Sequence, residues 1–394
     1  MKDRIVLLTK DAMGKFYLPV YGNKDWEMPN LKELAEKGTV FNRFYTAAPS
    51  TAMSFIGMFT QLNAYETEHR TYVPVTEQAK DTVFDKLYEK GYDCQIIWDE
   101  KWISMAKRFS ECYGEHTKFN LLHINQSVGR NNMYKGDLLC DDTLAEETMK
   151  TIEGTIEKIT SESKDKLFLW IHLPHVLLGR NCYGSDLDLF DRLIGFLREH
   201  FSDDAIYVSA DHGNMNGAKG KIGYGFDVYE PAICIPLIAP RINDLKTCDI
   251  PVGNVHMYDI MQGNIPEDEF VYCDCAYYGQ LHRKFALIKG NFKYIYNKEQ
   301  KTEELYDLAF DPNENCNIVT NKVYDVDRKL WTPLNQVYYY PDWDKAEEAL
   351  KLFRAEKDRV WRQESGFQTF KARIRRKLGR IHMKMIQSKA KKKK

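Results

Sequence analysis

The chain has 394 residues, of which 43% are hydrophobic and 29% charged, and its formal net charge is -1. These fractions are typical of a globular protein, and the length accommodates about two or three domains. No apolar run is long enough to cross a membrane, and the apolar part of the start is too short for a signal peptide. We therefore expect a cytoplasmic protein whose nine cysteines are reduced thiols.

Short apolar strands alternate with amphipathic helices over the first part of the chain. The expected strands cover residues 5–9, 40–45, 94–98, 167–172, 205–209 and 233–238. The expected helices cover residues 29–37, a segment that begins at 51, and residues 79–90, 141–160 and 186–201. The polar stretch 101–135 is expected to form loops over a site. This alternation predicts an α/β fold with a mainly parallel sheet that helices cover on both faces.

The pattern changes after Glu269. Short strands at 270–273, 283–289 and 292–297 are joined by tight turns, which is typical of an antiparallel sheet. A helix at 344–363 and a basic helix from Phe370 follow. We expect three parts. Residues 1–265 form an α/β domain that carries the site, residues 266–340 a small sheet subdomain packed on it, and residues 341–394 a helical, basic tail.

A hydroxyl residue begins a helix directly after a strand in the segment 45–61. Pro49 and Ser50 end the strand, and from Thr51 the apolar residues follow a helical spacing. The start of a helix offers free backbone N–H groups and the positive end of the helix dipole, which suit an oxyanion. Taken alone, Ser50 or Thr51 is better explained as an N-cap.

Three more polar side chains are expected where strands end. Asp11 follows the first strand, and Asp211 and His212 follow strand 205–209. Ligands of open α/β sheets bind at this edge. With Thr51, these residues form a set of oxygen donors and one nitrogen donor for one divalent metal, which favours Zn or Mn over Mg or Ca. Such a metal would make Thr51 a nucleophile. Singly, each acid would be explained as a turn cap and His212 as a packed polar residue.

Five segments resemble the sulfatase-like branch of the alkaline phosphatase superfamily, which includes sulfatases, lipoteichoic-acid synthases and phosphoethanolamine transferases. They lie between Ile5 and Val319 and follow the order of the family motifs, at residues 5–11, 28–41, 209–213, 229–238 and 304–317. The resemblance implies a sulfatase-like sandwich with a large, mainly parallel central sheet, a smaller C-terminal antiparallel sheet and C-terminal helices. It also implies that Asp11, Asp211 and His212 bind a metal.

The chain departs from the sulfatase pattern at the nucleophile. Sulfatases carry Cys or Ser, then one residue, then Pro-Ser-Arg, and that Cys or Ser is oxidised to formylglycine. Alignment on residues 58–61 places Thr51 at the nucleophile and keeps Ser54, although the Pro and Arg are replaced. The other register aligns residues 49–51 with Pro-Ser-Arg, which places Ala47 at the nucleophile position and implies an inactive site. Ala12 stands where many sulfatases have a second Asp. The remaining set of ligands, which is one acid, Thr, Asp and His, resembles that of the family transferases with a Thr nucleophile, which act on phosphodiesters.

The resemblance implies two further kinds of site residue. His175 resembles the family His that reaches the substrate anion, so it would protonate the leaving group or hold an oxygen. Lys221 or Lys219, in a Gly-rich loop after the second metal motif, would neutralise the transferred anion. A strand-end His bonded to backbone and a solvated lysine are the structural alternatives. The weaker candidates are His172, His256 with Asp259, His69 and His123.

The C-terminal segment 370–394 forms a basic amphipathic helix in this interpretation. Its apolar residues make one stripe, and twelve Lys and Arg without any acid lie in 371–394. This pattern suits an anionic membrane surface. No aromatic interleaving supports nucleic-acid binding, which we do not expect. A helix docked on the core with a disordered end is the structural alternative.

These patterns together predict a metal-dependent hydrolase or transferase of the sulfatase family. It would act on a phosphate ester or phosphodiester, glycan- or lipid-linked, through Thr51, in the cytoplasm or at the inner membrane face. One alternative is a sulfuric ester hydrolase that works without formylglycine. The other is an inactive sulfatase-like protein that binds an anionic partner.

Overall fold

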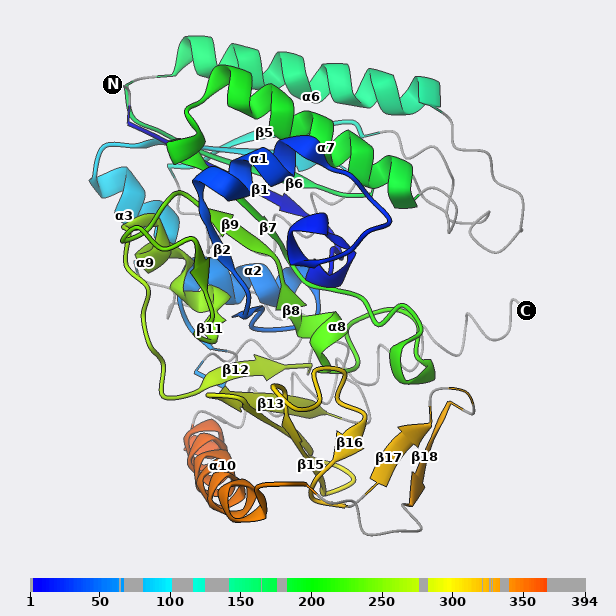
Figure 1. Ribbon diagram of the computed structural model, residues 1–394. Coiled ribbons are helices and arrows are strands. Elements are labelled where there is room, and N and C mark those ends of the chain that lie inside the picture. Colours follow the sequence, from blue (N-terminus) through cyan, green and yellow to red (C-terminus); the bar gives the residue numbers. More distant parts are fainter. Residues whose placement is uncertain are drawn as a thin grey trace, which may run out of the picture.

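The structure is a computed structural model with a large central sheet between two layers of helices and a smaller sheet on one side (Figure 1). It describes residues 3–63, 65–66, 81–100, 116–124, 142–163, 165–175, 183–275, 283–320, 322–325, 327, 329–333 and 340–366. None of the helices in these ranges is both long enough and apolar enough to span a bilayer.

Five neighbouring strands of the central sheet run parallel. Their order is β7 (Ile206–Ala210), β1 (Arg4–Lys10), β6 (Leu167–Leu173), β4 (Asp93–Asp99) and β5 (Lys118–Leu122). Beyond β7 the sheet continues with β9 (Leu237–Ala239), which is antiparallel to both neighbours, β2 (Thr39–Phe41) and β10 (Thr247–Cys248). Strands β1, β6 and β7 are buried almost throughout, because helices cover both faces.

Two groups of helices cover the central sheet (Figure 1). On one face lie α1 (Pro29–Lys37), α6 (Asp142–Glu162) and α7 (Tyr183–His200). On the other lie α2 (Thr51–Thr60), α3 (Val83–Glu89) and α9 (Met257–Met261). One continuous apolar core joins both groups to the sheet. The predicted fold class is therefore confirmed.

Two predicted strands each divide between two sheets, which corrects the prediction. Residues 40–45 form β2 and then β3 (Phe44–Tyr45), separated by a turn. Residues 233–238 begin in the short helix α8 (Glu230–Ile233) and form β8 (Cys234–Ile235) and β9 on either side of Pro236. Strands β3, β8 and β11 (Val252–Gly253) form a separate small sheet. Proline lacks the N–H that a continuous strand would donate, which explains the break at Pro236.

Two other predictions also differ from the structure. The polar stretch 101–135 contains strand β5, which lies at the edge of the sheet and is largely exposed, so it lacks the apolar pattern of the inner strands. The rest of that stretch lies mostly outside the described residues. The helix predicted at 79–90 begins at Val83, because the side chains of Thr82 and Asp85 form a capping box there.

The predicted antiparallel sheet is also present in the C-terminal part of the chain. It contains β12 (Val271–Asp274), β13 (Lys284–Lys289), β14 (Phe292–Asn297) and β15 (Thr302–Asp307) in that order. Helix α10 (Trp343–Gly366) packs on it, with the ring of Phe353 stacked on Tyr294 at 5.7 Å. A further sheet contains β16 (Cys316–Asn317), β17 (Lys322–Asp325) and β18 (Leu330–Pro333). The basic segment 370–394 lies outside the described residues.

A buried cluster of charges joins the small sheet to the segment after β7. The Nζ of Lys293, on β14, lies 3.0 Å from Glu230 Oε1 and 2.7 Å from Glu314 Oε1. Lys293 and Glu314 are inaccessible to solvent. Burial raises the pKa of Glu314 to about 7, although Lys293 opposes this effect. One ammonium group therefore compensates two carboxyl groups in the interior.

Replacing Lys293 with methionine should lower the free energy of unfolding by about 3–5 kcal/mol, because it leaves two buried carboxyl groups without their cation. Lys289→Met is the matched control, since Lys289 on β13 makes an exposed ion pair of 3.5 Å with Glu269 and lies 4.9 Å from the ring centre of Phe270. The control should cost under about 1 kcal/mol. Urea unfolding at pH 8 measures both variants, and equal losses would contradict the role of Lys293.

Candidate metal centre

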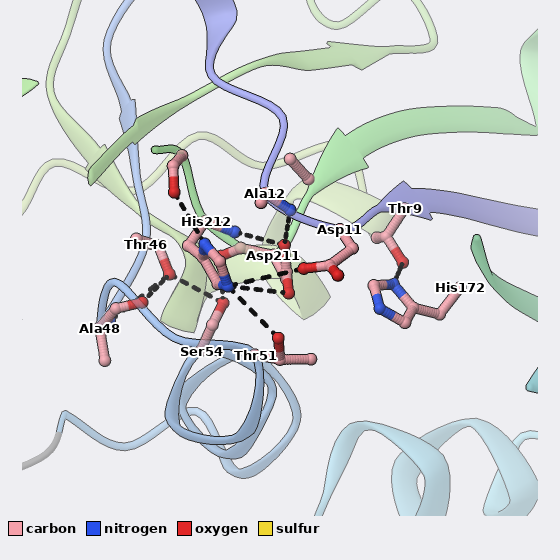
Figure 2. A network of polar contacts seen from close by, with 12 residues as sticks. Thr9, Asp11, Ala12, Thr46, Ala48, Thr51, Ser54, His172, Asp211 and His212 are labelled. Carbon is pink, nitrogen blue, oxygen red and sulfur yellow. Dashed lines mark hydrogen bonds and ion pairs between the residues drawn. The ribbon is translucent and has the colours of Figure 1, made fainter. Parts of the chain in front are cut away.

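Adjacent parallel strands bring two of the predicted acids to one edge of the central sheet. Lys10 is paired with Ala210 where β1 and β7 end, so Asp11 and Asp211 emerge side by side. His212 follows directly, and α2 brings Thr51 to the same place from a different part of the chain. Figure 2 shows these four side chains facing one another above the start of α2.

The polar atoms of this group converge on His212. Its Nε2 lies 3.7 Å from Asp11 Oδ1, 3.4 Å from Asp211 Oδ2 and 3.3 Å from Thr51 Oγ1. One ligand atom each from Asp11, Asp211 and His212 lies within 4.8 Å of the others. Asp211 and His212 are fully buried, and Asp11 and Thr51 are partly exposed. The structure thus brings together the four residues that the sequence suggested as metal ligands.

The hydrogen bonds of the group use the side-chain atoms that point away from its centre. Asp211 Oδ1 accepts hydrogen bonds from the backbone N–H groups of Ala12 and His212, at 2.9 and 2.7 Å. His212 Nδ1 lies 2.8 Å from the carbonyl oxygen of Gly213, which can only accept, so Nδ1 donates there and Nε2 is the nitrogen that faces the two carboxylates. Asp211 Oδ2 and Asp11 Oδ1 are buried and accept no hydrogen bond from the described residues. These unpaired acceptors fit a bound divalent cation.

A network behind the site fixes the start of α2 against the loop that carries Asp211. The Ser54 hydroxyl donates to the Asp211 carbonyl oxygen at 2.5 Å and lies 2.7 Å from the Thr46 hydroxyl (Figure 2). The amide of Asn254 donates to Ser54 Oγ at 3.0 Å and accepts from the Ala47 N–H at 2.9 Å. Ser54 belongs to the family motif, whereas nothing in the sequence pointed to Asn254, which lies 200 residues further along the chain.

The two histidines near the end of β6 have different partners. His172 Nδ1 lies 3.1 Å from Thr9 Oγ1, and burial lowers the pKa of His172 to about 3, so this imidazole is neutral. Figure 2 shows it beside Asp11. His175 is partly exposed, and its Nδ1 lies 2.9 Å from Asp186 Oδ2. Asp186 also contacts Lys10, and sequence analysis missed both residues, although a lysine in a buried strand requires a buried partner.

The two lysines proposed from the Gly-rich loop both contact protein groups. Lys221 forms an ion pair with the buried Asp227, which Lys284 also contacts at 2.9 Å. Lys219 donates hydrogen bonds to the backbone oxygens of Asn313 and Glu314, at 2.8 and 2.6 Å, and burial lowers the pKa of Lys219 to about 8. A role of either lysine toward a substrate anion stays a prediction.

The weaker histidine candidates form other contacts. His256 lies between Asp259 and Asp268, at 3.2 and 2.7 Å; burial opposes a charge there, but the two carboxylates raise its pKa. His123 contacts Glu100 at the surface. His69 lies outside the described residues. Ala47, the nucleophile position in the other register, offers only backbone polar groups to the site.

Comparisons with known proteins agree with this architecture. Residues 3–176 match the family model described as Sulfatase. An arylsulfatase of Clostridium perfringens is 33% identical over 98 residues, which make up 25% of this chain but only 20% of that protein. The chain therefore matches about a fifth of the length of this relative.

Solved structures show the same fold over nearly the whole chain. A candidate sulfatase of Bacteroides thetaiotaomicron has a TM-score of 0.62 at 13% identity and covers 95% of this chain and 96% of its own. A phosphonate monoester hydrolase of Agrobacterium radiobacter has a TM-score of 0.61 at 12% identity, with 92% and 96% covered. The chain therefore has the fold of these structures. Together with the match of residues 3–176 to the Sulfatase family model, this confirms the resemblance found in the sequence.

Proposed function

We propose that the protein is a metal-dependent hydrolase or transferase that cleaves a phosphate ester or phosphodiester with Thr51 as the nucleophile. The observation that carries this proposal is the position of the Thr51 hydroxyl. It lies at the first residue of α2 and 3.3 Å from His212 Nε2, beside two carboxylate oxygens that have no hydrogen-bond donor among the described residues.

Asp11, Asp211, His212 and Thr51 would hold the metal ion. When bound, it would lower the pKa of a hydroxyl in contact with it and neutralise negative charge on the substrate. The chain's own groups account for the bond changes. Thr51 Oγ1 loses its proton to solvent and forms a bond to phosphorus, while the bond from phosphorus to the leaving oxygen breaks. The free N–H groups at the start of α2 bind oxygens of the transferring group.

Two proton steps complete the cycle. His175, beyond the end of β6 at the same sheet edge, gives a proton to the leaving oxygen as that bond breaks. Water or an acceptor alcohol then attacks the phosphothreonine and gives its proton to His175, the bond to Thr51 Oγ1 breaks, and this oxygen regains a proton from solvent. Hydrolysis and transfer differ only in the group that attacks in this second step.

The side chain of Thr51 favours phosphorus over sulfur. Sulfatases need an aldehyde, which oxidation of Cys or Ser provides, whereas oxidation of a Thr side chain would give a ketone. A phosphothreonine needs no such modification, because water can release it by attack at phosphorus. A phosphonate monoester hydrolase has the same fold, which is therefore compatible with this chemistry. Assays of aryl sulfate, aryl phosphate and aryl phosphodiester on one preparation test the proposal, and faster turnover of the phosphorus esters is expected.

A sulfuric ester hydrolase is the second candidate, because the matched relative is an arylsulfatase. In that case the aryl sulfate would be the best of the three substrates. An inactive binding protein would turn over none of them.

The basic segment 370–394 leads us to propose a glycan- or lipid-linked substrate at an anionic membrane surface. Binding to vesicles that contain anionic lipid should gain roughly 1 kcal/mol for each basic residue near the surface and should weaken steeply with salt. A variant that ends at Gly366 should stay in the supernatant when vesicles are sedimented. Equal sedimentation of both proteins would contradict the proposal.

A further inference from the structure

We propose that Asp186 and Lys10 are positioning residues that hold His175 in the orientation and tautomer required of the leaving-group acid. The inference deepens the proposed function and rests on it for the kinetic role of His175. The three residues form one chain of contacts. Lys10 Nζ lies 2.6 Å from Asp186 Oδ2, and His175 Nδ1 lies 2.9 Å from the same oxygen.

The ionised carboxylate of Asp186 determines which nitrogen of His175 carries the fixed proton. A carboxylate can only accept, so Nδ1 must donate to it. The proton that His175 can release is therefore the one on Nε2, the atom on the other side of the ring. Asp186 thus holds the imidazole ring in one orientation, in the way that a buried acid orients a catalytic histidine.

Lys10 keeps Asp186 ionised in the interior. Both side chains are fully buried, where a lone carboxyl group would be protonated. Burial by itself raises the pKa of Asp186, but Lys10 and the hydrogen bond from His175 outweigh it and hold the pKa below its ordinary value. Asp186 lies in the first turn of α7, where the helix dipole also favours a negative charge.

The contacts also link the acid to the metal centre. Lys10 is the last residue of β1 and the neighbour of Asp11, while its side chain reaches α7, where Nζ lies 5.9 Å from the ring centre of Phe190. The backbone N–H of Asp11 donates to the carbonyl oxygen of Leu173 at 3.0 Å, two residues before His175. The same strand end therefore places a metal ligand and supports the acid.

A purely structural ion pair would have the same contacts, so the test must detect the state of His175. The double variant Lys10→Met with Asp186→Leu removes the acceptor without leaving a buried charge, and such replacements are often tolerated. Asp191→Asn is the matched control. Asp191 is a buried acid on the same helix, but its carboxylate accepts from the backbone N–H groups of Asn30 and Leu31, at 3.2 and 2.8 Å, at the start of α1.

The first measurement is long-range proton–nitrogen NMR of protein with labelled histidine, with the His175 signals assigned by their loss in His175→Gln. The neutral imidazole of wild-type His175 should be the Nδ1–H tautomer. The double variant should lose this preference, and the control should keep it. An unchanged tautomer in the double variant would overturn the proposal.

The second measurement compares kcat/KM for phosphoesters with good and poor leaving groups. The double variant should lose about 100-fold or more on an alkyl ester, but less than about tenfold on a nitrophenyl ester, whose leaving group needs no proton. Asp191→Asn should lower kcat/KM for the two esters equally. If the double variant also lowers them equally, its damage is only structural, and the role of Asp186 and Lys10 is refuted. If the wild type cleaves no phosphoester, the proposed function fails, and the tautomer measurement still decides whether Asp186 positions His175.

Discussion

Replacing Thr51 with alanine is expected to abolish cleavage of aryl phosphates and phosphodiesters, whereas Thr51→Ser retains part of it. Alanine removes the oxygen that forms the bond to phosphorus, so we expect a loss of at least about 1,000-fold. Serine keeps that oxygen at the start of α2 and loses only a methyl group. The contact of Thr51 Oγ1 with His212 Nε2, at 3.3 Å, should survive in the serine variant.

The matched control for this prediction is Thr60→Ala at the other end of α2. Among the described residues its hydroxyl donates only to the Ile56 carbonyl oxygen within the helix, at 2.6 Å, so its loss should leave the rate unchanged. Mass spectrometry of the peptide that contains Thr51, from enzyme quenched during turnover, should detect a phosphate on this residue. Full activity of Thr51→Ala, or sulfate turnover well above phosphate turnover, would overturn the assignment.

Replacing Asp211 with asparagine is expected to remove the bound metal and the activity together while the protein stays folded. The asparagine oxygen can still accept the two backbone N–H groups that contact Asp211 Oδ1, whereas its NH₂ group cannot replace the ligand atom Oδ2. Metal per chain, measured by mass spectrometry after dialysis against Zn²⁺ or Mn²⁺, should fall from about one to near zero. Added metal should also raise the Tm of the wild type but not of the variant, because only the wild type binds it.

Asp259→Asn is the control for the metal prediction. Asp259 and His256 were weaker site candidates in the sequence, but Asp259 pairs with His256 at 3.2 Å and lies outside the group of Asp11, Asp211 and His212. This variant should keep its metal and its activity. Wild-type protein that contains no metal after purification, and binds none when it is added back, would show that the site is wrong.

Local patterns in the sequence sufficed for most of the helices and strands and for the residues that we propose as metal ligands. Strands β1, β6 and β7 are continuous apolar runs, so their ends and the residues that follow them could be located. Because parallel strands end at one edge of the sheet, Asp11 and Asp211 could be expected together before their contacts were known. Thr51 was identified by a helix start, which is also a local signal.

Contacts between distant segments could not be predicted in this way. The split of residues 40–45 between two sheets depends on which strands lie beside them, since β2 pairs with β9 and β3 pairs with β8. Asn254 supports α2 from 200 residues away. Neither the pairing of strands nor a single hydrogen bond leaves a periodic pattern in the chain, because periodicity reflects only which side of an element is buried.

The sequence alone therefore predicts the fold and the residues proposed to bind the metal, since both depend on where strands and helices begin and end. The tertiary structure adds the hydrogen bond from His212 Nδ1 to the Gly213 carbonyl oxygen and the pairing of Lys10 with Asp186. Both contacts matter because the side chains that form them are buried. Without water to solvate them, the charges and lone pairs of these side chains must be satisfied by the few groups that folding places next to them.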